Sequence, residues 1–220
     1  MYPDGNTHLV SLIEGGPHLL YMSEWILSAA FLCKIGFGLL MVNYRGSRGY
    51  GQDYLLSVIG RIGDQDVKDV QFAVESVLKS GEFDAEKVAV MGGSHGAFLV
   101  CHLIGQYPGF YSAGVAHLIG QYPGFYSAGV ARNPVTNMAT MVSSTDIPDW
   151  CMVESGYDYS ADWLPDPEVW SQMLEKSPIK YVEQVQTPLL LLLGKNDKRV
   201  PNNQGMEFYR ALKVRQRPVR

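Results

Sequence analysis

Five consecutive leucines, residues 189–193, stand between Pro188 and Gly194 and constrain the fold more than any other stretch. A strand with one face in water alternates apolar and polar residues, and this run does not alternate. Such uninterrupted apolar runs are typical of strands in a parallel sheet, where helices cover both faces. We therefore predict a parallel sheet in which residues 189–193 are buried on both sides.

The rest of the chain alternates between strand-like and helix-like patterns. This alternation predicts an α/β fold with a mainly parallel sheet, helices on both faces and right-handed crossovers. Residues 148–167, rich in Asp, Pro and Trp, are predicted to be irregular. The predicted strands are residues 8–13, 37–43, 88–91, 189–193 and either 111–116 or 126–131, and the predicted helices are 25–35, 67–78, 97–104, 168–176 and 204–214.

A perfect repeat interrupts this pattern, because residues 102–116 and 117–131 are identical letter for letter. Solenoid proteins contain three or more diverged units, since one unit cannot bury its own apolar face. Two identical copies instead indicate a recent tandem duplication or an error in the assembled sequence. No linker divides the 220 residues, so we predict one domain over residues 1–220.

Charge and cysteine content exclude several classes of protein. The formal net charge of −4 gives no electrostatic footprint for nucleic acid or for an anionic membrane. No apolar stretch is long enough to span a bilayer, and the first residues lack the pattern of a signal peptide. The three cysteines are too few and too scattered for a disulfide framework or a zinc site. We therefore expect a cytoplasmic protein without metal or cofactor.

A glycine-rich pentapeptide, Gly-Gly-Ser-His-Gly at residues 92–96, lies between a predicted strand and a predicted helix. This is the context in which G-x-S-x-G forms a nucleophile elbow. Glycine is needed there because side chains flanking the serine would collide with neighbouring backbone. The turn would present the Ser94 hydroxyl above the sheet, while the backbone N–H of His95 would face an oxygen that becomes negative. The alternative is a plain glycine-rich turn.

A nucleophilic serine also needs a base and a carboxylate that orients the base. Asp197 follows the predicted strand 189–193, at the end of the sheet where such sites form, although it could equally be a solvated loop acid. The base should come after the acid in the chain, and none of the five histidines does. A second oxyanion donor is expected after the first strand, where Gly16 lets the backbone approach a carbonyl, or where the chain simply turns.

Longer stretches carry a resemblance to the prolyl oligopeptidase family of serine peptidases. The motifs that resemble it, in the family's order, are Gly-Gly-Pro-His at 15–18, Asn-Tyr-Arg-Gly-Ser at 43–47, the elbow at 92–96, and residues 194–201. Residues 64–74, 132–134, 144–151 and 205–213 extend the likeness over nearly the whole chain from about Ile13.

The resemblance implies an α/β-hydrolase fold and the release of an N-acylated amino acid from short peptides through an acyl-enzyme. In this reading Ser94 attacks, Asp197 orients the base, and the N–H groups of Gly16 and His95 hold the oxyanion. The resemblance also implies a cytoplasmic enzyme that forms homo-oligomers and needs neither metal nor cofactor.

The printed chain departs from the family pattern at its two ends. We expect the β-propeller domain of the family to be missing, together with the last strand and helix and the later loop that carries the family's catalytic histidine, because Arg220 precedes that loop. Loss of the histidine from a comparable triad lowers kcat by a factor on the order of 10⁶. We therefore expect a partial catalytic domain that is nearly inert alone.

Two other functions fit the sequence. One is a carboxylesterase or lipase activity on the same α/β-hydrolase fold. The other is a non-catalytic binding or assembly module.

Overall fold

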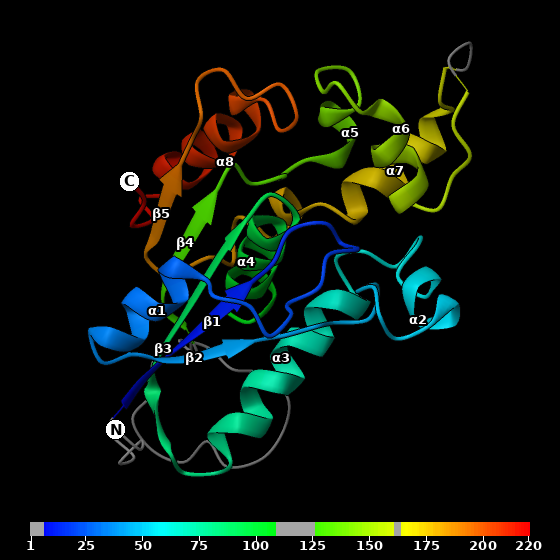
Figure 1. Ribbon diagram of the computed structural model, residues 1–220. Coiled ribbons are helices and arrows are strands. Elements are labelled where there is room, and N and C mark those ends of the chain that lie inside the picture. The colour runs from blue at the N-terminus through cyan, green and yellow to red at the C-terminus, as the bar shows by residue number, and fades with distance from the viewer. Residues whose placement is uncertain (1–6, 109–125, 161–163) are drawn as a thin grey trace.

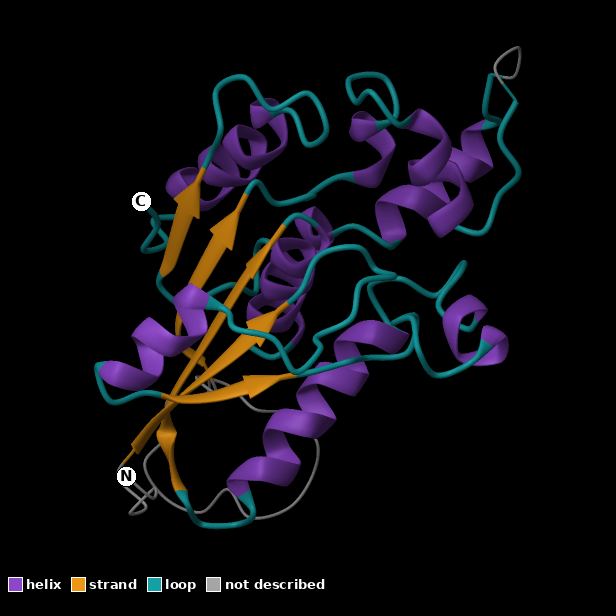
Figure 2. Cartoon of the chain, in the orientation of Figure 1, coloured by secondary structure: helices purple, strands orange, loops and turns teal. Residues whose placement is uncertain are grey.

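The computed structural model describes residues 7–108, 126–160 and 164–220. Five parallel strands form one sheet with the order β2-β1-β3-β4-β5 (Figures 1 and 2). The predicted parallel sheet is therefore confirmed. The strands are β1 (Thr7–Ile13), β2 (Gly38–Met41), β3 (Phe83–Gly93), β4 (Tyr126–Arg132) and β5 (Leu189–Leu192).

All five predicted helices are present, and three short helices and a 3-10 turn were not predicted. Figure 1 shows α1 on one side of the sheet and α4 on the other. The helices are α1 (Leu27–Lys34), α2 (Gln52–Leu56), α3 (Gln65–Leu78), α4 (His95–Gln106), α5 (Met138–Met141), α6 (Pro148–Glu154), α7 (Pro167–Glu175) and α8 (Asn202–Val214), with η1 at Pro178–Tyr181.

The prediction that residues 148–167 are irregular is wrong for their first part, which forms α6. Pro148 occupies the first turn, where its missing N–H costs nothing, and Asp149 follows it near the positive end of the helix dipole. Cys151 and Met152 are buried and attach α6 to the core. The proline and aspartate that suggested a loop are here the signals of a helix start.

The leucine run is buried on one face only, which corrects the prediction of burial on both faces. Leu189 is 3% exposed, whereas Leu190 and Leu192 are 41% and 42% exposed. Successive side chains of a strand point to opposite faces, so these two leucines share the open face. Helix α1 packs on β2, at the far edge of the sheet from β5, and so leaves that face of β5 uncovered.

The outer edge of β5 is occupied by the last residues of the chain. The Leu189 N–H donates to Pro218 O at 2.9 Å, and the Leu191 N–H donates to Arg220 O at 2.8 Å. Val219 pairs in parallel with Leu189. These contacts satisfy part of an edge that would otherwise be open to mispairing.

The two copies of the repeat contribute different elements. Helix α4 contains the start of the first copy, and β4 contains the end of the second copy. The other candidate for the fourth strand, residues 111–116, lies outside the described residues. Tyr126, at the start of β4, is buried and donates to Gln71 Oε1 at 2.9 Å, which ties the second copy to α3.

His102 is part of the core. Its Nε2–H donates to Lys176 O at 3.0 Å, and its Nδ1 accepts from the Gln106 amide at 2.8 Å. The neutral imidazole therefore satisfies both ring nitrogens. Burial lowers the pKa of His102 from 6.5 to about 4, because the charged ring would lose its hydration.

This shift predicts that the chain loses stability in mild acid. Between pH 6.5 and about 4 the unfolded chain binds a proton at His102 that the folded chain does not, so the free energy of unfolding falls as the pH falls. The full effect is about 3 kcal/mol. It is measured by urea unfolding at several pH values, with His102→Gln as the variant that cannot titrate. Identical pH profiles for the two proteins would contradict the assignment.

Candidate active site

The strand order reverses between β1 and β3, and the carboxyl ends of these two strands carry the candidate site. The chain passes from β1 to β2 on one side and later returns to β3 on the other side of β1. In open parallel sheets, ligands bind at the point where the strand order reverses in this way. Gly15 and Gly16 follow β1 at this point, and Ser94 follows β3.

The backbone at Ser94 makes the sharp strand-to-helix turn that the sequence predicted. Ser94 is exposed and has a φ of 55°, in the left-handed region, directly before the first residue of α4. A Cβ on Gly92 would lie 2.5 Å from the carbonyl carbon of Gly96, and a Cβ on Gly96 would lie 2.3 Å from Ile13 O. Both distances are sterically impossible, so the predicted need for glycine at this turn is confirmed.

The turn after β1 lies against the elbow. A Cβ on Gly15 would lie 3.3 Å from Gly93 O and 3.5 Å from Ser94 Cβ. Gly16 has a φ of 126°, which side chains rarely allow. The buried Tyr44 hydroxyl lies 3.3 Å and 3.4 Å from the carbonyl oxygens of Glu14 and Gly15, to which it donates. The two glycines are thus held beside the serine by a tyrosine from the loop after β2.

His18 anchors the far end of this turn. Its Nδ1 lies 2.8 Å from Gly46 O, and its Nε2 lies 3.1 Å from Glu154 Oε1 on α6. Both nitrogens face acceptors, so the arrangement favours the charged ring. The hydrogen bond with Glu154 is the main reason why the pKa of His18 is raised above 6.5, and the Gly46 carbonyl adds to it. The pair stabilises the fold at acidic pH and loses this effect as the pH rises through the raised pKa.

Asp197 lies on the loop that follows β5, as the sequence predicted. Its Oδ1 accepts the backbone N–H groups of Arg199 at 2.9 Å and of Val200 at 3.0 Å. Its Oδ2 accepts the side-chain amide of Asn133 at 2.5 Å. The carboxylate is therefore fixed in direction by three donors.

Asn133, which the sequence analysis did not single out for a site, connects the ends of β4 and β5. Its Oδ1 accepts from Gly194 N–H at 2.6 Å, and its Nδ2 donates to Asp197. Its backbone N–H donates to Leu192 O at 2.9 Å, and its φ is 44°. Asparagine tolerates this left-handed conformation better than most residues. The sequence could not reveal this connection, because β4 and β5 are far apart in the chain and become neighbours only in the folded sheet.

No described histidine contacts Asp197. His18 binds Gly46 and Glu154, His95 binds Asp66, and His102 binds Lys176 and Gln106. His8 lies on β1 beside Phe37. His117 falls outside the described ranges.

The described ranges show neither a cluster of metal ligands nor a membrane-spanning helix. They contain no group of three or more histidine, cysteine, aspartate or glutamate side chains arranged for a metal ion. Within them, no helix combines the length and the apolar character that crossing a bilayer requires.

A serine on a strand-to-helix elbow, followed by an aspartate after a later strand of the same parallel sheet, defines an α/β-hydrolase fold. The family model described as "Prolyl oligopeptidase family" matches residues 24–118 and 116–220. The chain belongs to the prolyl oligopeptidase family. The two matches meet within the duplicated segment, as expected if one family domain contains an extra copy of 15 residues.

Acylamino-acid-releasing enzymes from animals and plants are among the similar curated proteins. The chain is 59% identical to the acylamino-acid-releasing enzyme of Rattus norvegicus over 96% of its own length and 27% of the rat protein. It is 43% identical to the enzyme of the same name from Arabidopsis thaliana over 93% of this chain and 25% of that protein. The chain thus spans about a quarter of the length of these relatives.

Solved structures share the fold. The acylaminoacyl peptidase of Pyrococcus horikoshii superposes with a TM-score of 0.81 at 24% identity, over 99% of this chain and 32% of that one. A puromycin-hydrolyzing peptidase of Mycobacterium tuberculosis gives 0.83 at 24% identity, over 97% and 29%. The sheet and helices described above therefore form a known arrangement.

The contacts of Asn133 predict its effect on stability. Asn133→Gly keeps the left-handed backbone but loses both side-chain hydrogen bonds, which costs about 1–3 kcal/mol of unfolding free energy. Asn133→Ala loses the same bonds and also strains the backbone at φ 44°, which costs roughly 1 kcal/mol more. Urea unfolding measures both, and amide exchange at Gly194 should accelerate in both.

Asn196→Ala, an exposed change on the same loop, is the matched control and should shift stability by less than about 0.5 kcal/mol. A glycine variant as stable as the parent, with unchanged exchange at Gly194, would show that the Asn133 bridge contributes nothing.

Proposed function

We propose that the chain is a catalytic module of a serine peptidase of the acylaminoacyl-peptidase type. It would release an N-acylated amino acid from short peptides through an acyl-enzyme. Identity of 59% with the rat acylamino-acid-releasing enzyme over 96% of the chain supports this choice over other hydrolases of the same fold.

One observation carries the proposal: Ser94 and Asp197 follow strands that flank a single strand, β4. Ser94 N–H donates to Arg132 O at 2.9 Å, and the next residue, Asn133, binds Asp197. Neighbouring strands lie about 4.8 Å apart, so the ends of β3 and β5 are separated by roughly 10 Å. An imidazole ring with a hydrogen bond on each side spans roughly 8 Å. The separation therefore suits a histidine between the serine and the aspartate.

Each group has a definite task in this reaction. The imidazole removes the Ser94 proton as Oγ attacks the carbonyl carbon of the acylated residue, and Asp197 stabilises the resulting imidazolium. The backbone N–H groups of Gly16 and His95 donate to the oxygen that becomes negative. The imidazolium then protonates the leaving amine, and water later releases the acylated amino acid from Ser94 in the reverse sequence.

The base of the proposed triad is a histidine outside the described residues. The four described histidines are engaged elsewhere or lie on β1, as described above. Among the described residues, Asp197 therefore has no imidazole partner. We also propose a cytoplasmic location, which the three unpaired cysteines support, and assembly into homo-oligomers, which rests on the family resemblance alone.

A missing imidazole can be supplied from solution, and this tests the proposal. The 220-residue chain should hydrolyse N-acetyl-alanine p-nitroanilide slowly, and free imidazole should raise the rate. Because a positioned base acts with an effective molarity of about 10⁵ M or more, free imidazole restores only a small part of full activity. The imidazole-dependent rate should vanish in Ser94→Ala and fall strongly in Asp197→Asn.

Asp146→Asn is the matched control, because Asp146 is an exposed carboxylate that pairs with Arg199 near the same loop. Its imidazole-dependent rate should equal that of the parent. Equal rates in the parent and in Ser94→Ala would show that the serine is not a nucleophile.

A further inference from the structure

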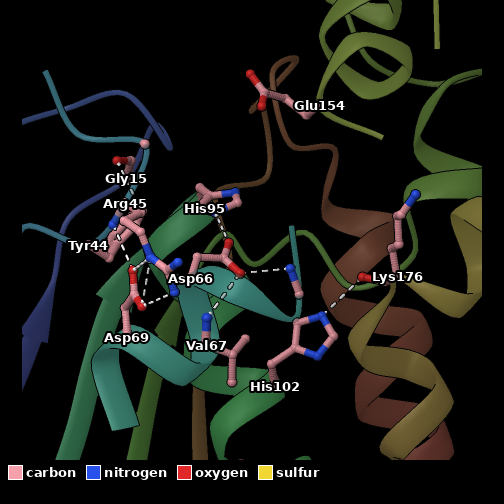
Figure 3. Close-up of polar contacts among 12 residues, drawn as sticks. Gly15, Tyr44, Arg45, Asp66, Val67, Asp69, His95, His102, Glu154 and Lys176 are labelled. Atoms are coloured by element: carbon pink, nitrogen blue, oxygen red, sulfur yellow. Dashed lines mark hydrogen bonds and ion pairs between the residues drawn. The ribbon is translucent and has the colours of Figure 1, made fainter. Parts of the chain in front are cut away.

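A second carboxylate–imidazole pair, Asp66 and His95, lies next to the elbow, and its side chains have no part in the reaction proposed above. Asp66 Oδ2 and His95 Nε2 are 2.9 Å apart, and both side chains are 0% exposed (Figure 3). Asp66 Oδ1 also accepts the backbone N–H groups of Gly63 at 2.8 Å and of Val67 at 3.0 Å. Three donors therefore converge on one buried carboxylate at the first turn of α3.

These contacts determine the tautomer of His95. A carboxylate only accepts hydrogen bonds, so Nε2 carries the hydrogen that is donated to Asp66. The other ring nitrogen, Nδ1, is buried and has no hydrogen-bond partner among the described residues. An unpaired buried nitrogen is unfavourable, so the ring is held here by the bond to Asp66 and by packing.

The packing of the ring leaves it little freedom. Phe98 stacks on it with a centroid distance of 4.9 Å, and Trp150 meets it edge-on at 6.1 Å. Tyr44 lies 6.1 Å from it in a tilted arrangement. Tyr44 is also the residue whose hydroxyl holds the Gly15–Gly16 turn, so the ring belongs to a cluster that contacts both the elbow and the turn after β1.

Because of the position of His95 in the chain, anchoring its ring also affects the direction of its backbone N–H. His95 is the first residue of α4 and directly follows Ser94. Its own backbone N–H is one of the two proposed oxyanion donors. A rotation of the first turn of α4 would therefore redirect that N–H, and an oxyanion donor acts only when it is preorganised.

We propose that Asp66 is a positioning residue: through the buried ring of His95 it fixes the direction of the His95 backbone N–H toward the oxyanion. The inference rests on the proposed function, because it assigns a supporting group to that site. Asp66 touches neither the substrate nor Ser94 in this account.

The first experiment reads the tautomer, which needs no catalytic activity. In Asp66→Asn the amide oxygen still accepts from Gly63 and Val67, and the new NH₂ group faces His95 Nε2. Turning the amide around would instead place NH₂ against two backbone donors. In the favoured orientation the NH₂ group donates to His95 Nε2. Because Nε2 must then accept a hydrogen bond, the ring hydrogen moves to Nδ1. The imidazole ¹H–¹⁵N correlation spectrum should show an Nε2–H tautomer in the parent and an Nδ1–H tautomer in Asp66→Asn, with His95→Gln identifying the signal.

The second experiment uses the imidazole-dependent hydrolysis described above. Asp66→Ala removes the partner of His95 Nε2 and should lower kcat at least about tenfold, while KM changes little, because an oxyanion donor acts mainly in the transition state. His95→Gln places an amide N–H near the position of Nε2 and should keep most of kcat, whereas His95→Leu should not. Asp69→Ala, on the same helix and bonded to the exposed Arg45, is the control and should leave kcat unchanged.

The outcomes separate the two proposals. If the parent shows no Ser94-dependent rate, the proposed function fails, and the role of Asp66 fails with it. If the parent is active but Asp66→Asn keeps the Nε2–H tautomer, or Asp66→Ala keeps the parent kcat, only the positioning role is overturned. A loss of kcat that His95→Gln and His95→Leu share equally would also overturn it.

Discussion

The close approach of three backbone segments at Gly96 is the constraint on which the rest of the site depends. A single carbon atom at this position would lie 2.3 Å from the carbonyl oxygen that ends β1, and one at Gly92 would lie 2.5 Å from Gly96 itself. Only glycine therefore lets α4 begin directly against β1 and β3. With that contact made, the chain has no room to turn gradually, and Ser94 takes a strained backbone conformation with a positive φ of 55°. The exposed serine is thus a consequence of backbone packing beneath it.

Side chains from distant parts of the sequence then hold the ends of the strands in relation to one another. Tyr44 binds the turn after β1, Asp66 binds the first residue of α4, and Asn133 binds the loop after β5. Each of them joins two segments that lie at least 29 residues apart, so none is set by local structure. These three contacts lie at the carboxyl edge of the sheet, whereas most of the core beneath is apolar. Rigidity at that edge is what a preorganised site requires.

The elements were largely predictable, and the supports of the site were not. The spacing of apolar residues along the chain and the glycine spacing around Ser94 predicted the sheet, its helices and the elbow. Both patterns are properties of residues that are close together in the sequence. The burial of both faces of β5 was wrongly predicted, since a run of leucines does not reveal which helices cover it. Pro148 and Asp149 favoured the prediction of a loop, although the same residue types also start helices. Asn133 and Asp66 depend on contacts between strands and helices, which sequence spacing alone does not reveal.

The bend at residue 94 presents an alcohol that an imidazole can activate. This activation is tested most directly by treating the intact chain with a fluorophosphonate in the presence of free imidazole and mapping the modified residue by peptide mass spectrometry. We expect a single adduct on Ser94 that depends on imidazole and on folding of the chain. An adduct on another residue, or no adduct on the folded chain at any imidazole concentration, would contradict it.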